Sequence, residues 1–469
     1  MVRHRHVATL LAAAAVGGAL VLSGCSSSGG SGGSGTSASS AKSITVWTEE
    51  NDPQRMTEQR NIIAKFTAAT GIHVKLVGIA ENQFSTLVTS SAAGGSLPDV
   101  IGALPVSDAD TLAEEKIADS AAANAVVGKL GRSTFSATAL RLATQGGSLV
   151  GVPSDSWVQL LVYRQDLFTK YHLPTPDTYA NIAHDAAVLK SRGYTGIVAA
   201  TDANDAFTEQ TFEYVSLANG CQLVNSGGKI TLGSSSCQQA FSFYDNLIKK
   251  DSVAGAQTVD TTEQDYLAGK AGMIIWSSYI LPSLAGQEQG STPSCSQCKS
   301  DPGYLAKNSG IVTSISGGSG STAEDYGQLS TWVISRESPA KASAEKFVSY
   351  MMSTGYSSWL SLDPPGKLPV RTTTGTEPTA SAWAKLPIAL GGSKTTSDFY
   401  SASTITSLID GPEHITEWGL PYGQGALLGE TLASEPVPSV ISSMTSGSTS
   451  PAAADQQAVA LVQSIQANQ

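Results

Sequence analysis

Along the chain, the spacing of hydrophobic positions switches between the period of two that is typical of strands and the period of about 3.6 that is typical of helices. This alternation predicts βα units. Ile44-Thr-Val-Trp47 has a period of two and predicts a strand. Residues 55–70 place Ile62, Ile63 and Phe66 on one helical face, and Gly71 stands where a C-cap glycine belongs. A strand at 74–79, a helix at 84–93 and a strand entered through residues 97–101 should follow. This order is typical of an α/β fold with a mainly parallel sheet.

Two further blocks repeat the pattern. The second predicts strands at 158–163, 196–200 and 272–276, and helices at 179–192 and leading to Lys250. Residues 286–322 are rich in Gly, Ser, Pro and Cys and predict a long surface excursion. The third predicts a strand at 331–334 with Trp332 in the core, and a helix at 340–351. Ser338-Pro339 and Ser450-Pro451 are expected N-cap and N1 pairs. The blocks indicate two α/β lobes with more than one crossing between them.

The N-terminus has the layout of a bacterial export signal. Arg3 and Arg5 form a positive head, residues 7–22 are apolar and short for a membrane span, and Leu22-Ser-Gly-Cys25 follows. This motif looks like a lipobox, so we expect residues 1–24 to be a lipoprotein signal peptide and Cys25 to be diacylated. Residues 25–42, almost wholly Ser, Gly, Ala and Thr after the cysteine, predict a flexible tether. An ordinary secretory signal with an incidental cysteine is the alternative.

The charge balance excludes some classes of partner. The formal net charge of −11 argues against nucleic acid and against a basic patch for anionic lipid. After the signal, no stretch approaches roughly eighteen apolar residues, so the lipid would be the only membrane contact.

Four further cysteines remain in an exported chain, which suggests disulfides. Three pairings are open, and the local one joins Cys221 to Cys237 and Cys295 to Cys298. A zinc site of four thiolates is the alternative, because Cys295-Ser-Gln-Cys298 has ligand spacing. Cys221 and Cys237 lack that spacing and no histidine lies near, so we expect no metal.

Several segments in order resemble the family 1 extracellular solute-binding proteins, the group that contains maltose-binding protein. The resemblance covers residues 43–466; its segments are Ile44-Thr-Val-Trp47, Phe66-Thr-Ala-Ala-Thr-Gly71, Gly94-Gly-Ser-Leu-Pro-Asp-Val100, Gly151-Val-Pro153 through Tyr163-Arg-Gln-Asp-Leu-Phe168 and Leu173-Pro-Thr-Pro176, Tyr266-Leu-Ala-Gly-Lys-Ala-Gly-Met273, and Lys367-Leu-Pro-Val-Arg371. None of the segments is specific alone; the ordered set carries the resemblance.

The resemblance implies a two-lobed periplasmic-binding-protein-like fold that closes on a small solute like a hinge. Crossovers would lie near Pro153, Gly327 and Arg371. One lobe would hold residues 43–153 and 328–370, and the other residues 154–327 and 371–469. It further implies a monomer without cofactor that passes a sugar or oligosaccharide to an ABC permease at the extracellular face of the cell membrane.

Sugar receptors pair aromatic platforms with polar side chains, and the ends of strands are where loops face a cleft. This reasoning, together with the resemblance, selects the candidate ligand-binding residues. They are Trp47, Glu49, Glu50, Asn51, Asp108, Asp155, Trp157, Glu209, Phe212, Trp276, Tyr279, Arg371, Trp418 and Tyr422. Each has an ordinary structural alternative, such as a solvated loop for the carboxylates, core packing for Trp276 and a crossover salt bridge for Arg371. Glu49 and Glu50 could accept sugar hydroxyls or a cationic group.

The sequence also departs from the sugar-binding pattern. After Asp99-Val100, where many members have a tryptophan, the chain reads Ile101-Gly-Ala-Leu-Pro-Val-Ser-Asp108 without an aromatic residue. This puts one platform, and a long oligosaccharide ligand, in doubt.

Two other classes of function compete with a binding protein. An exported enzyme such as a glycoside hydrolase is disfavoured, because no Gly-x-Ser-x-Gly elbow stands between a strand and a helix, and paired carboxylates are common in any acidic chain. A sensor or adhesion lipoprotein on the same fold stays open. We expect a binding protein, not an enzyme.

Overall fold

The computed structural model describes residues 41–469 except 319, 321–323 and 376–377. The lipobox cysteine Cys25, the signal and nearly all of the expected tether lie outside the described residues.

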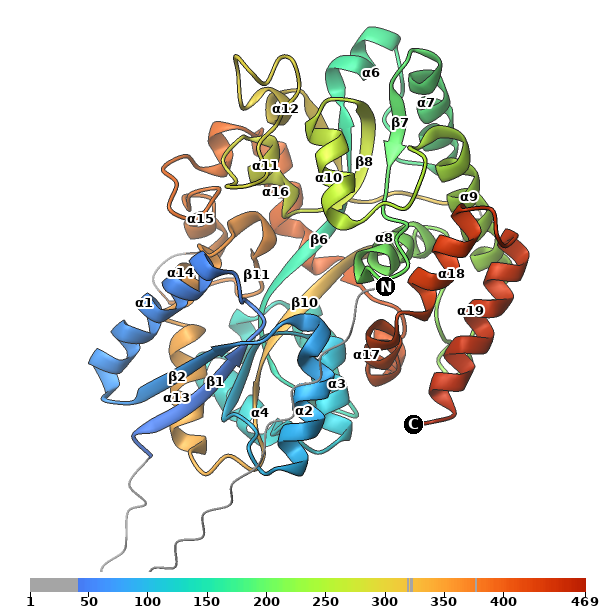
Figure 1. Cartoon of the computed structure of the whole chain (residues 1–469). Coiled ribbons are helices and arrows are strands. Elements are labelled where there is room, and N and C mark those ends of the chain that lie inside the picture. Colours follow the sequence, from blue (N-terminus) through green and yellow to red (C-terminus); the bar gives the residue numbers. More distant parts are fainter. Residues whose placement is uncertain (1–40, 319, 321–323, 376–377) are drawn as a thin grey trace, which may run out of the picture. The chain divides into compact units, whose positions relative to one another are not determined.

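Strands and helices alternate along the chain (Figure 1). The strands are β1 Ser43–Thr48, β2 His73–Gly78, β3 Val100–Pro105, β4 Thr144–Gln145, β5 Ser148–Leu149, β6 Val152–Arg164, β7 Thr195–Val198, β8 Ala271–Ser277, β9 Ser309–Val312, β10 Asp325–Ile334, β11 Leu368–Pro369 and β12 Ile415–Thr416. The helices of the first half are α1 Pro53–Thr70, α2 Phe84–Ala93, α3 Val106–Glu114, α4 Ser120–Leu130, α5 Ala137–Leu142, α6 Gln165–Tyr171, α7 Tyr179–Ser191 and α8 Ala206–Leu217. Those of the second half are α9 Ser235–Asp251, α10 Val259–Leu267, α11 Ile280–Leu284, α12 Tyr304–Lys307, α13 Lys341–Met351, α14 Tyr356–Leu360, α15 Thr379–Trp383, α16 Ala402–Asp410, α17 Gly425–Ser434, α18 Pro436–Thr445 and α19 Pro451–Gln466.

The main sheet has the strand order β2-β1-β3-β10-β6-β8-β7. Pairing is parallel at its two ends, where β1 lies between β2 and β3 and where β7 meets β8. It is antiparallel in the middle, where β10 pairs with β3 and β6, and β6 pairs with β8. The expected α/β fold, a central sheet flanked by helices, is confirmed. The expectation of mainly parallel pairing holds only at the ends, because β6 and β10 run in opposite directions through the middle of the sheet.

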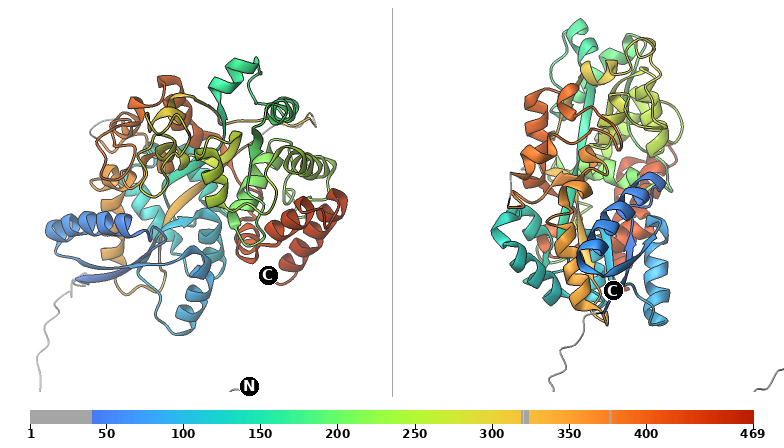
Figure 2. Two further views of the ribbon diagram at one scale, coloured as in Figure 1. Left: turned by 45° about the horizontal axis from the view of Figure 1, so that its top comes forward. Right: turned by 90° about the vertical axis from the view of Figure 1, so that its left-hand side faces the viewer.

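Strand β6 joins the two ends of the sheet. Its first half, Val152–Val158, pairs with β10, and its second half, from Gln159 onward, pairs with β8 and β9. Figures 1 and 2 show β6 and β10 passing through the middle of the fold, with β1 and β2 toward one end and β7 and β8 toward the other. Residues at the ends of strands from both parts can therefore face one another.

Local signals in the sequence explain the first βα unit. Asp52 caps α1 by accepting hydrogen bonds from the backbone N–H groups of Gln54 and Arg55, at 2.8 and 3.1 Å. Pro53 occupies the first helical position, and Gly71 ends the helix in the left-handed conformation at φ 71°. Phe66 is fully buried on the apolar face of this helix. The helix predicted at 84–93 coincides with α2.

Trp332 lies in the core, as predicted, with 1% of its surface exposed. Its indole crosses Gly102 so closely that a Cβ added there would lie 2.0 Å from Trp332 Cζ3. A glycine in β3 is therefore required by the tryptophan of β10.

One of the two predicted N-caps is wrong. Helix α13 begins at Lys341 rather than at the Ser338-Pro339 pair, and its N-cap residue makes no side-chain capping bond. Ser338 instead donates a hydrogen bond to Asp99 and accepts one from the backbone N–H of Ala340 at 3.0 Å. By contrast, Ser450 caps α19 as expected, through the N–H of Ala453 at 3.3 Å.

The segment 286–322 is not only a surface excursion. It contains α12 and β9, and β9 pairs with the second half of β6. Cys295 and Cys298 are buried in it and bonded to each other. Composition alone missed the strand pairing because glycine, serine and proline do not indicate that part of a segment joins the sheet.

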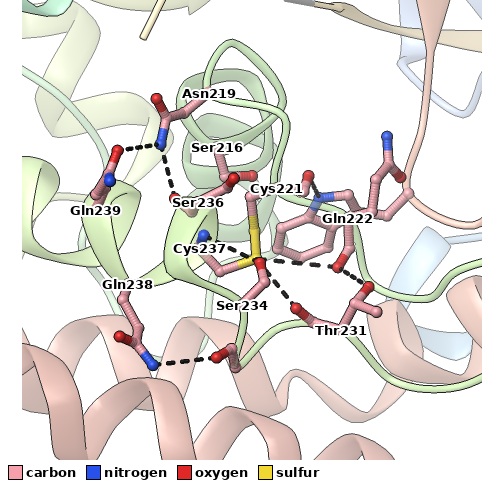
Figure 3. Close-up of a disulfide and its surroundings, with 12 residues drawn as sticks. Ser216, Asn219, Cys221, Gln222, Thr231, Ser234, Ser236, Cys237, Gln238 and Gln239 are labelled. Atoms are coloured by element: carbon pink, nitrogen blue, oxygen red, sulfur yellow. Dashed lines mark hydrogen bonds between the residues drawn. A yellow bond between two sulfur atoms is a disulfide. The ribbon is translucent and has the colours of Figure 1, made fainter. Parts of the chain in front are cut away.

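Both expected local disulfides are present in the structure. Cys221 and Cys237 join the end of α8 to the start of α9, with both residues fully buried. In Figure 3, Asn219 beside this disulfide donates to the backbone carbonyl of Ser236 at 2.8 Å. The indole N–H of Trp418 donates to the Cys221 carbonyl at 3.1 Å. The disulfide thus fastens α8, one wall of the site described next.

Candidate functional site

Two adjoining cavities lie beside the carboxyl ends of β1, β2 and β3. Cavity A has a volume of about 470 Å³ and cavity B about 550 Å³. Both are lined by Glu81, Pro105, Gln210 and Gln328, so they form one continuous cleft. Their size is that of ordinary small-molecule sites.

The cleft is built from strand ends on one side and helices on the other. Glu49 and Glu50 follow β1, Glu81 follows β2, and Asp108 stands in the first turn of α3 directly after β3. Because these three strands are parallel neighbours, their carboxyl ends meet at one edge of the sheet. The opposite wall comes from α8, α10 and the end of β8.

Aromatic side chains form the wall of cavity A. Trp157 packs edge-on against Tyr326, with ring centroids 5.7 Å apart. Trp276 lies 5.3 Å from Phe207 and donates its indole N–H to the Val259 carbonyl at 3.3 Å. These contacts fix the rings while leaving them at the cavity surface, the arrangement that a flat apolar ligand face requires.

A buried ion network closes the base of cavity A. Lys367 Nζ lies 2.5 Å from Glu50 Oε1 and 3.2 Å from Asp155 Oδ2. Arg55 lies 3.0 Å from Glu50 Oε2 and also pairs with Asp363. These cations lower the pKa of the buried Glu50 to about 2, against the opposing effect of desolvation. The network joins the first βα unit to β6 and to the segment before β11.

Tyr279 lies over this network. The guanidinium of Arg55 stands 5.5 Å from the centre of its ring. The ring also lies directly on Gly366, where an added Cβ would approach Tyr279 Cε1 to 2.0 Å. The ring is therefore held in place at the cavity wall rather than free to turn away.

Carboxylates dominate the rest of the cleft. Ten acidic side chains line the two cavities, against Arg55 as the sole cation among the described lining residues: Glu49, Glu50, Glu81, Asp108, Asp205, Asp260, Glu263, Glu288, Asp363 and Glu435. Only Glu50 and Asp363 form ion pairs within the described part of the chain.

Burial, and after it repulsion among these acids, raises their pKa values. Burial raises the pKa of Glu49 well above its usual range, and the charges of Asp108, Glu81 and Glu50 raise it further. Burial and then the charge of Glu81 raise the pKa of Asp108 to about 7. Desolvation between the walls of the cleft raises the pKa of Glu81, although its side chain remains exposed to solvent. The junction of the two cavities therefore gathers acids that hold their protons more tightly than free carboxyls do.

Six of the fourteen predicted ligand-binding residues line the cleft. They are Glu49, Glu50, Trp157, Trp276 and Tyr279 in cavity A and Asp108 in cavity B. The structure thus brings together side chains that are as far apart in the sequence as β1 and β8.

The other eight lie outside the two cavities: Trp47, Asn51, Asp155, Glu209, Phe212, Arg371, Trp418 and Tyr422. Asp155 belongs to the ion network, and its Oδ1 accepts from the Trp359 indole N–H at 2.6 Å. The Arg371 guanidinium donates to Thr134 Oγ1 and to the Leu130 and Met352 carbonyls.

Three of the remaining six pack in the core. Trp47 is in the core, and Phe212 and Trp418 are fully buried and pack against each other with centroids 6.1 Å apart. Asn51 donates to the Ile79 carbonyl at 3.0 Å, and Tyr422 is on the surface. Glu209 is fully buried, with no hydrogen-bond partner for its carboxylate among the described residues.

Sequence reasoning missed several lining residues. Glu81 follows β2 just as Glu49 follows β1, so the same rule of strand ends could have found it. Arg55 lies in the first turn of α1, and only its distant partner Asp363 reveals its role. Gln328 lies inside β10 and carries no signal of its own, yet it lines both cavities.

No metal centre or membrane-spanning helix is found in the described residues. No group of three or more His, Cys, Asp or Glu side chains there is arranged to hold a metal ion. None of the helices described combines the length and the apolar character that crossing a bilayer needs.

Comparison with known proteins adds independent findings. A family model described as bacterial extracellular solute-binding protein matches residues 53–357. A putative ABC transporter periplasmic-binding protein, YcjN of Escherichia coli (strain K12), is 28% identical over 337 residues, 70% of this chain and 73% of the relative.

Solved structures share the fold. Maltose-bound MalE3 of T. maritima superposes with a TM-score of 0.69 at 16% identity, covering 91% of this chain and 100% of that one. A sugar transporter from Arthrobacter chlorophenolicus A6 with bound laminaribiose gives a TM-score of 0.68 at 16% identity, covering 90% and 99%. At such identities the likeness concerns the fold.

Proposed function

This chain belongs to the bacterial extracellular solute-binding protein family, and we propose that it binds a carbohydrate in the cleft and delivers it to an ABC permease. The observation that carries the proposal is cavity A, where fixed aromatic rings stand beside hydrogen-bonding carboxylates. Sugars present apolar CH faces and hydroxyl rims, and this wall offers a partner for both. Two solved relatives with the same fold hold maltose and laminaribiose.

The proposed ligand contacts follow from the lining residues. Trp157, Trp276 and Tyr279 would stack against sugar rings in cavity A. Glu49 and Asp108 would accept hydrogen bonds from the ligand at the junction and in cavity B.

We also propose that the cleft separates two lobes that close as a hinge. One lobe would hold residues 43–153 and 328–370, and the other residues 154–327 and 371–469. The passage of β6 and β10 between the two ends of the sheet supports this division, since both strands cross near the proposed boundaries. Closure would bring the α8–α10 wall against the ends of β1, β2 and β3.

Anchoring completes the proposal. Cys25, diacylated and followed by the Ser/Gly-rich segment, would hold a monomeric receptor at the outer face of the cell membrane. Two acyl chains are needed for stable anchoring. Replacing Cys25 by serine should release the protein from membranes into the medium without changing its melting temperature, and retention of the variant on membranes would contradict the anchor.

A thermal-shift screen tests the carbohydrate assignment, because a ligand that binds the folded state must raise its melting temperature. The mature protein should be stabilised by at least one mono- or oligosaccharide. If no sugar, polyol or glycoside shifts the melting temperature, the carbohydrate assignment is lost although the family stands. Uptake of the identified sugar by cells, with and without the gene, then separates import from a sensing or adhesion role.

A further inference from the structure

The charge imbalance of the cleft exceeds what a neutral ligand needs. Neutral sugars are bound by hydrogen bonds, which amides and hydroxyls supply without mutual repulsion. Here Glu49, Glu81 and Asp108 come from the ends of three adjacent strands, and none of them forms an ion pair within the described residues. Holding like charges together between low-dielectric walls costs free energy, which falls either when the carboxyls keep their protons, as their raised pKa values indicate, or when a cation pairs with them.

Buried acceptors without donors show where a ligand can supply hydrogen bonds. Asp363 lines cavity A and is 5% exposed; Arg55 binds its Oδ2, while its Oδ1 has no hydrogen-bond partner among the described residues. Glu49 Oε1 is also buried at the cavity and without a partner in the same part of the chain. An unpaired buried acceptor is costly, so these oxygens are suited to donors that arrive with a ligand.

A metal ion does not fit this arrangement. The described acidic, histidine and cysteine side chains include no group of three placed to coordinate one ion. The spread of the carboxylates along the cleft matches several N–H donors on an extended organic molecule better than one compact cation.

We propose that the ligand is an amino sugar or amino-sugar oligosaccharide with a free, protonated amine, seated at the junction of the two cavities by Glu49, Glu81 and Asp108. The aromatic wall of Trp157 and Trp276 would hold the sugar ring in cavity A. This inference rests on the proposed carbohydrate function and adds the charge of the ligand to it. A protonated amine at this junction replaces repulsion among the three carboxylates by attraction to each.

The first test compares ligands that differ only at one substituent. The probes are sets of oligosaccharides with the same linkage and length that carry a free amine, an N-acetyl group or a hydroxyl, such as glucosamine, N-acetylglucosamine and glucose oligomers. Isothermal titration calorimetry should give at least tenfold tighter binding of the amine than of either neutral form. The advantage should shrink as salt is raised from 20 to 500 mM, because the interaction is screened.

The second test uses isosteric variants. Asp108→Asn and Glu81→Gln should each weaken binding of the amine probe at least fivefold more than they weaken binding of the hydroxyl probe. Glu337→Gln is the matched control, an exposed acid outside both cavities. A purely structural role for the carboxylates would change both probes together, so the ratio of the two affinities is the decisive readout.

The outcomes separate this inference from the proposed function. Tighter binding of the hydroxyl or N-acetyl form overturns the cationic ligand but leaves a carbohydrate receptor. Binding of spermidine or arginine without any sugar overturns both the amino sugar and the carbohydrate assignment. Absence of binding across all probe sets overturns both as well.

Discussion

Replacing Lys367 by methionine tests whether the ion network holds the base of the cleft. Lys367 is 1% exposed, and its ammonium contacts Glu50 and Asp155 while standing 4.4 Å from the centre of the Trp359 ring. Methionine keeps most of the volume but removes the charge. Two buried carboxylates then lose their shared cation, which costs about 3–5 kcal/mol in buried pairs.

The lowered pKa of Glu50 gives an independent measure of how much the ion network stabilises the fold. This pKa is lowered from 4.5 to about 2, mainly by Lys367 and Arg55 acting against desolvation. At about 1.4 kcal/mol per pKa unit, this shift corresponds to about 3 kcal/mol of stability shared between the two cations. Because the pKa is depressed in the folded state, this stability is present above pH 4.5 and is lost as the pH falls toward 2.

Urea unfolding followed by tryptophan fluorescence measures the effect. At pH 7, Lys367→Met should lower the free energy of unfolding by about 3–5 kcal/mol. Lys270→Met is the matched control, since Lys270 is 70% exposed and 3.9 Å from Asp265. The control should change stability by less than about 0.5 kcal/mol.

A second substitution tests whether the loss of stability comes from the uncompensated carboxylates. Adding Glu50→Gln to Lys367→Met removes one of the uncompensated charges and should restore part of the lost stability. A loss below about 1 kcal/mol in Lys367→Met would refute the reasoning, because water would then have to be solvating the two carboxylates. A double variant less stable than Lys367→Met would contradict it as well.

Three further predictions follow from the same structure. Trp157→Ala and Tyr279→Ala should each lower carbohydrate affinity at least tenfold by calorimetry while circular dichroism shows a folded protein; unchanged affinity in both removes the aromatic wall from the site. Breaking the disulfide with Cys221→Ala should cost about 3 kcal/mol in urea unfolding, and the unreduced, unfolded mature protein should titrate no thiol other than an unlipidated Cys25. Burial raises the pKa of Glu417 to about 8, so its contribution to stability is full below pH 4.5 and falls as the pH rises to 8. The change in the free energy of unfolding caused by Glu417→Gln should therefore be more favourable at pH 8 than at pH 4, by about 1–3 kcal/mol. An equal change at both pH values would refute the raised pKa of Glu417.

Local signals decided which elements could be predicted from the sequence. Helix α1 carries its cap at Asp52, its proline at Pro53 and its stop at Gly71, and each acts within one turn of the residues it controls. Strand direction has no such local signal. Buried runs such as β6 and β10 read alike whether they pair in parallel or antiparallel, so the mixed sheet became visible only in three dimensions.

The residues of the candidate site divide in the same way, into those that sequence order predicts and those that only the fold places. Glu49 and Asp108 could be predicted because parallel strands bring their carboxyl ends together, a rule that depends on sequence order alone. Asp155 was predicted to face the ligand but lies in the ion network, because Lys367, more than two hundred residues away, occupies it. Pairings at that separation depend on the fold, and a single sequence carries no record of them.

Composition was the least informative guide to function, and the cleft shows why. In the sequence, 39 acidic residues against 28 basic ones indicate only an acidic protein, for which solubility is sufficient explanation. Charge that served solubility alone would be spread over the surface, where its self-repulsion is smallest. Instead, acidic side chains gather along two joined cavities, and Arg55, the cation that lines cavity A, is already paired. Carboxyls placed in this way keep their protons until a positive group pairs with them, and so the placement of the acids, rather than their number, is the basis for proposing a protonated amine as the ligand group.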